Sequence, residues 1–429
     1  MNLIINNKLS EKKDLLFPVA VFLLQLLKNL RGFENIEYVV IGTLIIGILC
    51  KLINTSNHVQ TKNIYYVLFM FAIIVISIIN AKNISRTANN FLILFLIMIF
   101  FVIRTNNQDD SYIYKMFDQF KSFFIVIAVL NIYQIVLHKP ILSNFLASNI
   151  NPKASLFGNS EFRTMSVFAN ALVAGSGFLV GLIFSYYLIK DKLMKFFMII
   201  LMLWNIYSTQ SRSTWLSLAL IFFLILLIDI TRTDVFRVRF NYNLVMIFPI
   251  ILIIVVIVCV LLLHTSFVSE VISRFGDSLN VNNSTDISNL QRIGGLKLVL
   301  SNITGIHWIF GYGNGSVADL LESNRIVLSD FKTLDNQYFT ILYENGILGI
   351  VFILIPLITS LKRLFFDKNI NRYGNALYIS CISLYFTFFF YEGIYWNTIG
   401  TIFAIFVSCI MFFNVGIYEK KSIDKPVMK

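Results

Sequence analysis

The sequence predicts an all-α, polytopic integral membrane protein with about 12 transmembrane helices and one long extracytoplasmic loop. Composition is the first indication: 57% of the 429 residues are hydrophobic and only 14% are charged, too few to cover a soluble surface. The second is a series of apolar stretches, each near the roughly 20 residues that cross a bilayer. The third is a single long polar interruption at residues 266–335.

Helices are expected in the apolar stretches because a lipid-exposed segment must pair its N–H and C=O groups within itself. The alternating pattern of a membrane barrel is absent. Two further charge-free windows, 140–152 and 298–318, contain prolines or glycines and are interpreted as loops. The predicted spans are residues 15–31, 36–53, 64–81, 88–104, 120–138, 165–189, 194–209, 212–230, 241–265, 336–361, 373–391 and 395–417.

The distribution of Lys and Arg predicts the orientation, because these residues favour the cytoplasmic side of short loops. With the N-terminus inside, 22 of the 35 basic residues fall on the cytoplasmic side and 13 outside. We therefore expect a multi-pass protein of the cell (plasma) membrane with both termini cytoplasmic. Helices 1–9 then occupy residues 1–265, an extracytoplasmic loop with interfacial helices occupies 266–335, and helices 10–12 with a cytoplasmic tail occupy 336–429.

Arg212 is the one charged residue within residues 196–228. A single helix over this stretch would be about 50 Å long, well beyond the ~30 Å hydrocarbon core. We therefore expect a turn at residues 208–211, which places Arg212 at the outer mouth of the eighth helix.

The long loop contains two apolar patterns at helical spacing, which predict helices that lie on the bilayer surface. Such helices above a bundle would roof a cavity open to lipid, a shape that admits a substrate with a lipid tail. The patterns are Val268, Ile272, Phe275 and Leu279, and Ile293, Leu296, Leu300 and Ile303.

Several outer segments resemble the O-antigen polymerase and O-antigen ligase family, the Wzy and WaaL enzymes that join lipid-linked sugar chains. Order, spacing and predicted side agree across residues 160–350. The segments are 208–215 (STQSRSTW), similar to T-x-S-R-x-x-W; 163–170 (RTMSVFAN), similar to R-x-x-x-x-F-x-N; and 310–313 (FGYG), 335–339 (DNQYF) and 344–349 (ENGILG), similar to a G-x-G turn, [H/D]-N-x-x-L and E-x-G-x-x-G.

The resemblance implies a metal-independent, inverting glycosyltransferase of the GT-C class, without a cofactor. Its donor would be an oligosaccharide on a polyprenyl diphosphate such as undecaprenyl diphosphate, and its acceptor a sugar hydroxyl. Ligases of the family usually have His where this chain has Asp335. That difference favours a Wzy-type polymerase of a surface polysaccharide such as a capsule, working with membrane lipid and a chain-length regulator.

Arginine and a carboxylate carry the predicted chemistry. Arg212 and Arg292 are the first candidates to neutralise the departing diphosphate, and Arg163 is a second, because guanidinium binds phosphate bidentately. For each, the alternative is contact with lipid headgroups. Asp335 is the candidate that receives the acceptor hydroxyl proton, with a helix N-cap as its alternative role.

Asn336, Tyr338 and Glu344 are further candidates for substrate binding, since they lie in the segments that carry the resemblance. Glu344 would be buried, and an inward polar contact is as good an interpretation. Glu392, in the turn at residues 391–396, is expected in an interfacial aromatic belt.

The glycines of residues 311–315 lack dinucleotide-binding spacing and predict a flexible turn. Basic residues are dispersed along membrane edges, which argues against a nucleic-acid partner despite the net charge of +12.

A ligase that transfers a finished glycan is the alternative within the family. A flippase or transporter is the alternative from another class, for which paired interrupted helices and mid-membrane charges would be typical.

Overall fold

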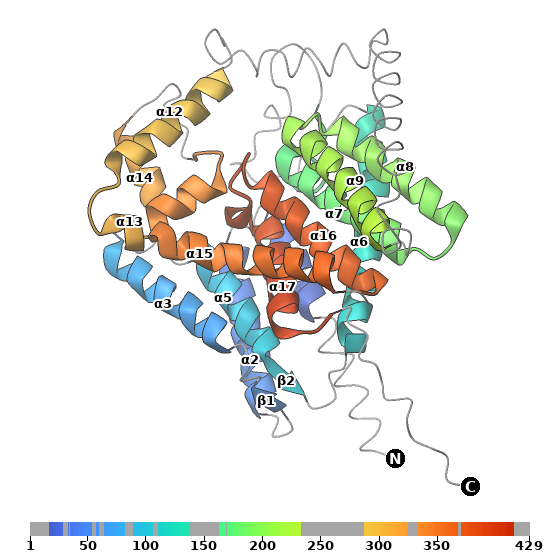
Figure 1. Cartoon of the computed structure of the whole chain (residues 1–429), viewed down its shortest axis with the longest axis horizontal. Coiled ribbons are helices and arrows are strands. Elements are labelled where there is room, and N and C mark those ends of the chain that lie inside the picture. The colour runs from blue at the N-terminus through green and yellow to red at the C-terminus, as the bar shows by residue number, and fades with distance from the viewer. Residues whose placement is uncertain are drawn as a thin grey trace, which may run out of the picture.

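The computed structural model describes residues 17–28, 33, 35–53, 57–59, 64–81, 89–105, 110–137, 163–168, 170–232, 287–324, 333–367 and 370–415. In these ranges the chain is helical apart from one short ribbon, which confirms the predicted all-α class (Figure 1). The helices are Phe17–Leu27, α2 (Ile36–Ile53), α3 (Ile64–Asn80), α5 (Asn89–Val102), α6 (Asp110–Leu137), α7 (Ala171–Leu188), α8 (Lys192–Ser208), α9 (Arg212–Arg232), α12 (Ile287–Asn302), α13 (His307–Phe310), α14 (Ser316–Ser323), α15 (Gln337–Phe366), α16 (Arg372–Thr387), the 3₁₀ turn η5 (Gly393–Tyr395) and α17 (Asn397–Phe412).

Every predicted span except 241–265 overlaps one of these helices, and 241–265 lies outside the described residues. Two starts differ: α6 begins at Asp110, ten residues before the predicted 120, and α7 begins at Ala171, six residues after the predicted 165. Four helices, α2, α6, α7 and α15, are long and apolar enough to cross a membrane. The total of twelve crossings stays a prediction. The window 298–318 is only partly a loop, because its first residues complete α12 and its middle forms α13.

Helix α7 lies at the centre of the bundle, and small residues explain why. It is buried on nearly all faces, and three glycines replace side chains where neighbouring elements approach. A Cβ on Gly175 would collide with the Thr214 hydroxyl of α9, and one on Gly177 with the Phe168 ring. Close backbone approach through small residues is how helices pack within a membrane.

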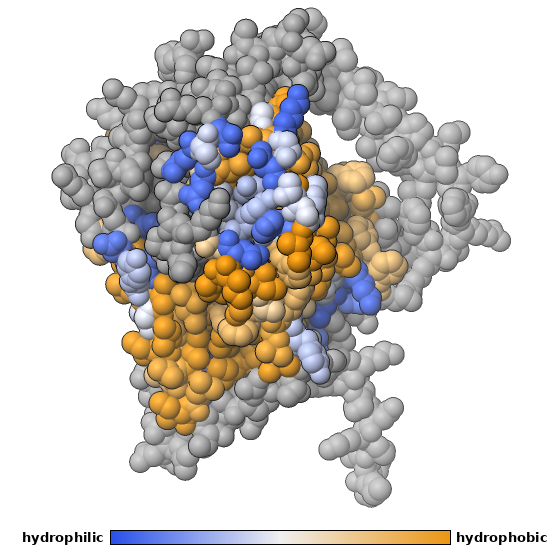
Figure 2. All heavy atoms as spheres, turned by 90° about the vertical axis from the view of Figure 1, so that its left-hand side faces the viewer, coloured by the Kyte–Doolittle hydropathy of each residue, from blue (hydrophilic) through white to orange (hydrophobic). Residues whose placement is uncertain are grey.

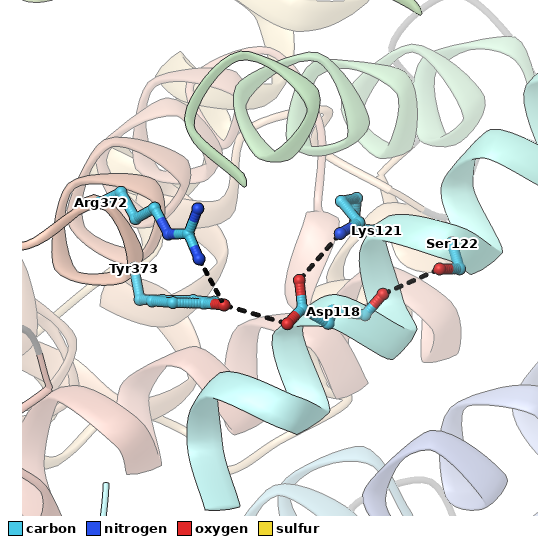
Figure 3. Close-up of polar contacts among 5 residues, drawn as sticks. All are labelled: Asp118, Lys121, Ser122, Arg372 and Tyr373. Atoms are coloured by element: carbon cyan, nitrogen blue, oxygen red, sulfur yellow. Dashed lines mark hydrogen bonds and ion pairs between the residues drawn. The ribbon is translucent and has the colours of Figure 1, made fainter. Parts of the chain in front are cut away.

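Polar contacts join the helix ends in two groups. At one end, β1 (Asn57–Val59) after α2 pairs antiparallel with β2 (Ile103–Thr105) after α5. Figure 3 shows the same end of α6 and α16, where Asp118 accepts from Tyr373 at 3.0 Å and pairs with Lys121 at 2.8 Å, and Arg372 donates to Tyr373 at 3.2 Å.

At the opposite end, Asn397 at the start of α17 donates to Glu37 at the start of α2, 2.6 Å away. The last turn of α3 contacts the Gly311–Gly315 segment there, through Asn80 and Ser77. These are the groupings expected from alternating crossings, with α12, α13 and α14 at the second end. The assignment of this second end to the outside stays a prediction from the basic residues.

The surface is divided in the way a membrane requires. Figure 2 shows apolar side chains over one region of the molecule and hydrophilic ones gathered in another. Helix α3 contributes to the apolar region with large exposed side chains that a soluble protein would bury. These side chains are Tyr65, Leu68, Phe71 and Ile79.

The packing of α7 on α9 can be tested with matched glycine substitutions. We expect Gly175→Ala to lower the free energy of unfolding by about 1–3 kcal/mol, since the new methyl group overlaps Thr214. Gly42→Ala in α2 is the control, because no atom lies within 4 Å of its Cβ position. Thermal unfolding in detergent measures both; equal melting temperatures for the two variants would contradict the packing.

Candidate active site

Two of the motif segments are bonded directly to each other. The N–H of Thr164 donates to the carbonyl of Ser208 at 3.1 Å, and their hydroxyls lie 2.7 Å apart. The Nε of Arg163 donates to the carbonyl of Thr209 at 3.1 Å. Thr209 precedes Arg212 by three residues in the chain. The bond from Arg163 therefore places two of the three candidate arginines at the same turn, residues 208–211.

Buried amide side chains hold this pair of segments in place. Oε1 of Gln134 accepts from the N–H groups of Met165 (2.9 Å) and Ser166 (2.7 Å). Nδ2 of Asn131 donates to Asn205 at 2.7 Å, which links α6 to α8. The Gln134 side chain of α6 therefore supports the backbone of residues 165 and 166, which belong to no helix or strand, and the bond from Asn131 to Asn205 fixes α6 against α8.

The predicted turn before Arg212 is confirmed: α8 ends at Ser208 and α9 begins at Arg212. Gln210 adopts a left-handed φ of 50°, which reverses the chain. Ser211 then accepts from the N–H of Thr214 at 3.3 Å, as an N-cap does. Arg212 is half-buried at the first position of α9.

Helix α15 is broken in its third turn, at Gly346, and resumes directly afterwards. Gly346 has φ 64° and ψ −163°, which no helix contains. The freed carbonyls of Tyr343 and Glu344 accept from the N–H groups of Tyr312 (2.9 Å) and Gly313 (2.8 Å). Irregular backbone at membrane depth is tolerated where protein satisfies it in this way.

The glycine turn is fixed by these contacts, so the expectation of a flexible turn is wrong. Gly311 has φ 70°, and a Cβ there would collide with the backbone of Glu344. A Cβ on Gly346 would collide with the backbone of Ile309. The two backbones touch because glycine occupies both crossing points.

Glu344 is buried, with 2% of its surface exposed, and it caps α14. Its Oε1 accepts from the N–H of Gly315 at 2.8 Å and lies 3.5 Å from that of Val317. Its Oε2 accepts from the hydroxyl of Tyr395. The inward polar contact that the sequence allowed is present, and substrate binding by Glu344 stays a prediction.

Asp335 lies where the chain re-enters the bundle, with a left-handed φ of 51°. Its Oδ1 accepts from the hydroxyl of Thr333 at 3.4 Å. The alternative role as a helix N-cap is wrong, because Asn336 caps α15 by accepting from Tyr338 (3.1 Å) and Phe339 (3.2 Å). Because Asp335 is in a left-handed turn, the first residue whose side chain reaches the N–H groups at the start of α15 is Asn336.

Tyr338 is mainly a packing residue. Its hydroxyl donates to the carbonyl of Tyr385 at 2.6 Å, and its ring lies 4.3 Å from that of Phe389. These contacts attach the start of α15 to the end of α16. A substrate contact by Tyr338 stays a prediction.

Glu392 is the residue that the sequence interpretation missed. Only 7% of its surface is exposed, so its side chain is packed within the protein. Its place at the membrane interface stays a prediction. Its Oε1 accepts from the N–H of Leu334 (2.8 Å) and the hydroxyl of Thr340 (2.7 Å), on either side of Asp335. A lone acid between two apolar spans was the available signal, since a charge there is costly and usually has a partner.

The structure thus brings the candidates into two groups joined through α7. Arg163 and Arg212 form the first; Asp335, Asn336, Tyr338 and Glu344 form the second around residues 388–395. Thr214 packs against Gly175, and the hydroxyl of the adjacent Ser176 accepts from the hydroxyl of Tyr391 at 2.7 Å. Arg292 lies on α12, and its side chain lies outside the described residues.

The described residues contain no group of three His, Cys, Asp or Glu side chains that could share a metal ion. Metal independence and inversion both stay predictions.

Residues 197–354 match the family described as O-antigen ligase. No curated protein matches the chain. The matched range contains the 208–215, 310–313, 335–339 and 344–349 segments and excludes the segment at 163–170.

The contact between the two broken segments predicts the effect of glycine substitution. We expect Gly311→Ala to destabilise by about 2 kcal/mol or more, because a left-handed alanine is strained and its Cβ meets backbone. Gly305→Ala has a similar φ of 54° with no atom within 4 Å, so it isolates the strain alone. Thermal unfolding should rank Gly311→Ala clearly below Gly305→Ala; the reverse order would refute the close crossing.

Burial also predicts a pH dependence of stability at Glu392. Desolvation raises the pKa of this carboxyl from 4.5 to about 7, against the lowering effect of the bonds from Thr340 and Leu334, and Asp335 raises it further. Its contribution to stability is therefore complete below pH 4.5 and is lost as the pH rises through about 7. Compared with Glu392→Gln, the wild-type melting temperature should fall over this range; a pH-independent difference would be the contrary result.

Proposed function

We propose that this chain, whose residues 197–354 match the family described as O-antigen ligase, polymerises polyprenyl-diphosphate-linked oligosaccharide repeats into a surface polysaccharide. The observation that supports the proposal is that the motif segments lie at one end of the bundle, in two groups linked through α7. Arg163 and Arg212 flank the 208–211 turn, and Asp335 lies at the re-entry of α15. Lipid-linked oligosaccharides are the substrates that the family implies.

The two arginines suit the leaving group. In the proposed reaction an acceptor hydroxyl oxygen bonds to the anomeric carbon while the bond from that carbon to the diphosphate oxygen breaks. Negative charge then develops on the diphosphate, and a fixed guanidinium stabilises it in a site of low dielectric. Arg163 is held for this role by the bond from its Nε to the carbonyl of Thr209.

Asp335 suits the acceptor. The hydroxyl loses its proton as the new bond forms, and a carboxylate within reach takes it up. The left-handed turn at Asp335 and the cap at Asn336 give the carboxylate a fixed position at the mouth of α15. The products are a glycan longer by one repeat and a free polyprenyl diphosphate.

Two observations favour other functions and define the test. The matched family is described as O-antigen ligase, which favours transfer of a finished glycan to a different acceptor. The break in α15 at Gly346 is a feature of transporters, in which broken helices point their free ends at a substrate. Against transport, the carbonyls freed at this break are bonded to Tyr312 and Gly313.

One assay separates the three functions. Purified protein in detergent or vesicles is given lipid-linked repeat units, and the glycans are resolved by length. A ladder of products supports polymerisation. A single transfer to a foreign acceptor identifies a ligase, and movement across the vesicle membrane without a new glycosidic bond identifies a transporter.

Arg212→Ala and Asp335→Ala should reduce transfer by about 10²-fold or more, the usual effect of removing a charge-stabilising or proton-accepting group. Arg372→Ala is the matched control, since Arg372 is also the first residue of a helix. Figure 3 shows it beside Asp118 near the start of α6, whereas Gln134 near the end of α6 bonds to the 163–168 segment. Initial rates at equal amounts of folded protein measure the effect. Wild-type rates in either test variant would refute the assignment.

A further inference from the structure

The segment after α16 holds the re-entry point of α15 through several backbone contacts. The carbonyl of Phe388 accepts from the N–H of Gln337 at 2.9 Å, and that of Phe389 accepts from Nδ2 of Asn336 at 3.0 Å. In return, Oε1 of Gln337 accepts from the N–H of Ile394 at 2.9 Å. This segment lies outside the range that matches the family, residues 197–354.

Glu392 adds the two contacts closest to Asp335. A single oxygen, Oε1, accepts from Leu334, the residue before Asp335, and from Thr340, on the first turns of α15. Both donors are buried. The carboxyl therefore ties the chain before the turn to the helix after it.

Asp335 needs such support because a left-handed φ is unfavourable for any residue with a Cβ. Without a fixed acceptor for the Leu334 N–H, the turn would relax towards an extended conformation. Relaxation would move the Asp335 carboxylate away from the mouth of α15. A displacement of about 1 Å in a reacting group can cost about 10²-fold in rate.

We propose that Glu392 is a positioning residue for Asp335, acting through the Leu334 amide and the Thr340 hydroxyl. The inference rests on the proposed function. Glu392 touches no reacting atom; it fixes the turn from which Asp335 meets the acceptor. Its contacts require an acceptor oxygen and no charge, which separates it from an acid or base in the reaction.

That distinction gives the test, because glutamine keeps the oxygen and loses the charge. Glu392→Leu should lower kcat for transfer by about tenfold to a hundredfold. KM for the lipid-linked donor should stay within about twofold, since the arginines bind it. Glu392→Gln should restore kcat to within about threefold of wild type.

Thr340 provides an independent pair of variants. Thr340→Val removes one donor and should lower kcat, whereas Thr340→Ser keeps the hydroxyl and should not. Because both residues act through one contact, Glu392→Leu with Thr340→Val should be no worse than Glu392→Leu alone. If Glu392→Leu fails to fold, the difference in kcat between Thr340→Val and Thr340→Ser tests the positioning role.

Hydrogen exchange of the peptide at residues 333–340 gives a readout without activity. The Leu334 amide should exchange slowly in wild type and Glu392→Gln and faster in Glu392→Leu. If wild type forms no glycosidic bond, the proposed function fails, while this exchange pattern still reports on the turn. With an active wild type, the inference is overturned if Glu392→Gln is as slow as Glu392→Leu, or if Glu392→Leu keeps both wild-type kcat and protection.

Discussion

The constraint on which this structure depends is the pairing of backbone polar groups where α15 breaks. A break within an apolar bundle leaves carbonyls that cannot bond to water. Here the N–H groups of Tyr312 and Gly313 pair with the carbonyls of Tyr343 and Glu344, so the glycine turn is bonded to the interrupted helix. The two backbones can approach this closely because residues 311 and 346 are glycines, and a side chain at either position would push them apart.

Buried carboxylates then attach neighbouring elements to the same place. Glu344 accepts from the first amides of α14, and Glu392 accepts from the residue before Asp335. Each is surrounded by donors, which is the condition under which an acid can be buried at acceptable cost. A single turn, residues 391–395, supplies Glu392 and the Tyr395 hydroxyl that contacts Glu344, so both acids belong to one polar assembly.

The arginine side of the site is built by a different device. Amides from Gln134, Asn131 and Asn205 hold backbone segments that no helix organises. The glycines of α7 let α9 and residues 163–168 approach closely enough for those bonds to form. Rigid support beneath this turn is consistent with the proposed role of the two arginines, because a group that stabilises a leaving diphosphate works best when it need not rearrange.

The sequence by itself determined the helical class, most of the described helix positions and the turn before Arg212, because apolar length and charge placement follow local rules that lipid imposes on every segment. Motif spacing within residues 208–349 also pointed to the family model that residues 197–354 match. Only the tertiary structure decided the contacts of the polar residues. Asn336 caps α15 in place of Asp335 because of one left-handed turn. Glu392 is buried beside Leu334 because packing brings together two segments that are 58 residues apart in the chain. Hydrogen bonds between distant segments leave no periodic pattern in a sequence, and they appear only when packing brings donor and acceptor together.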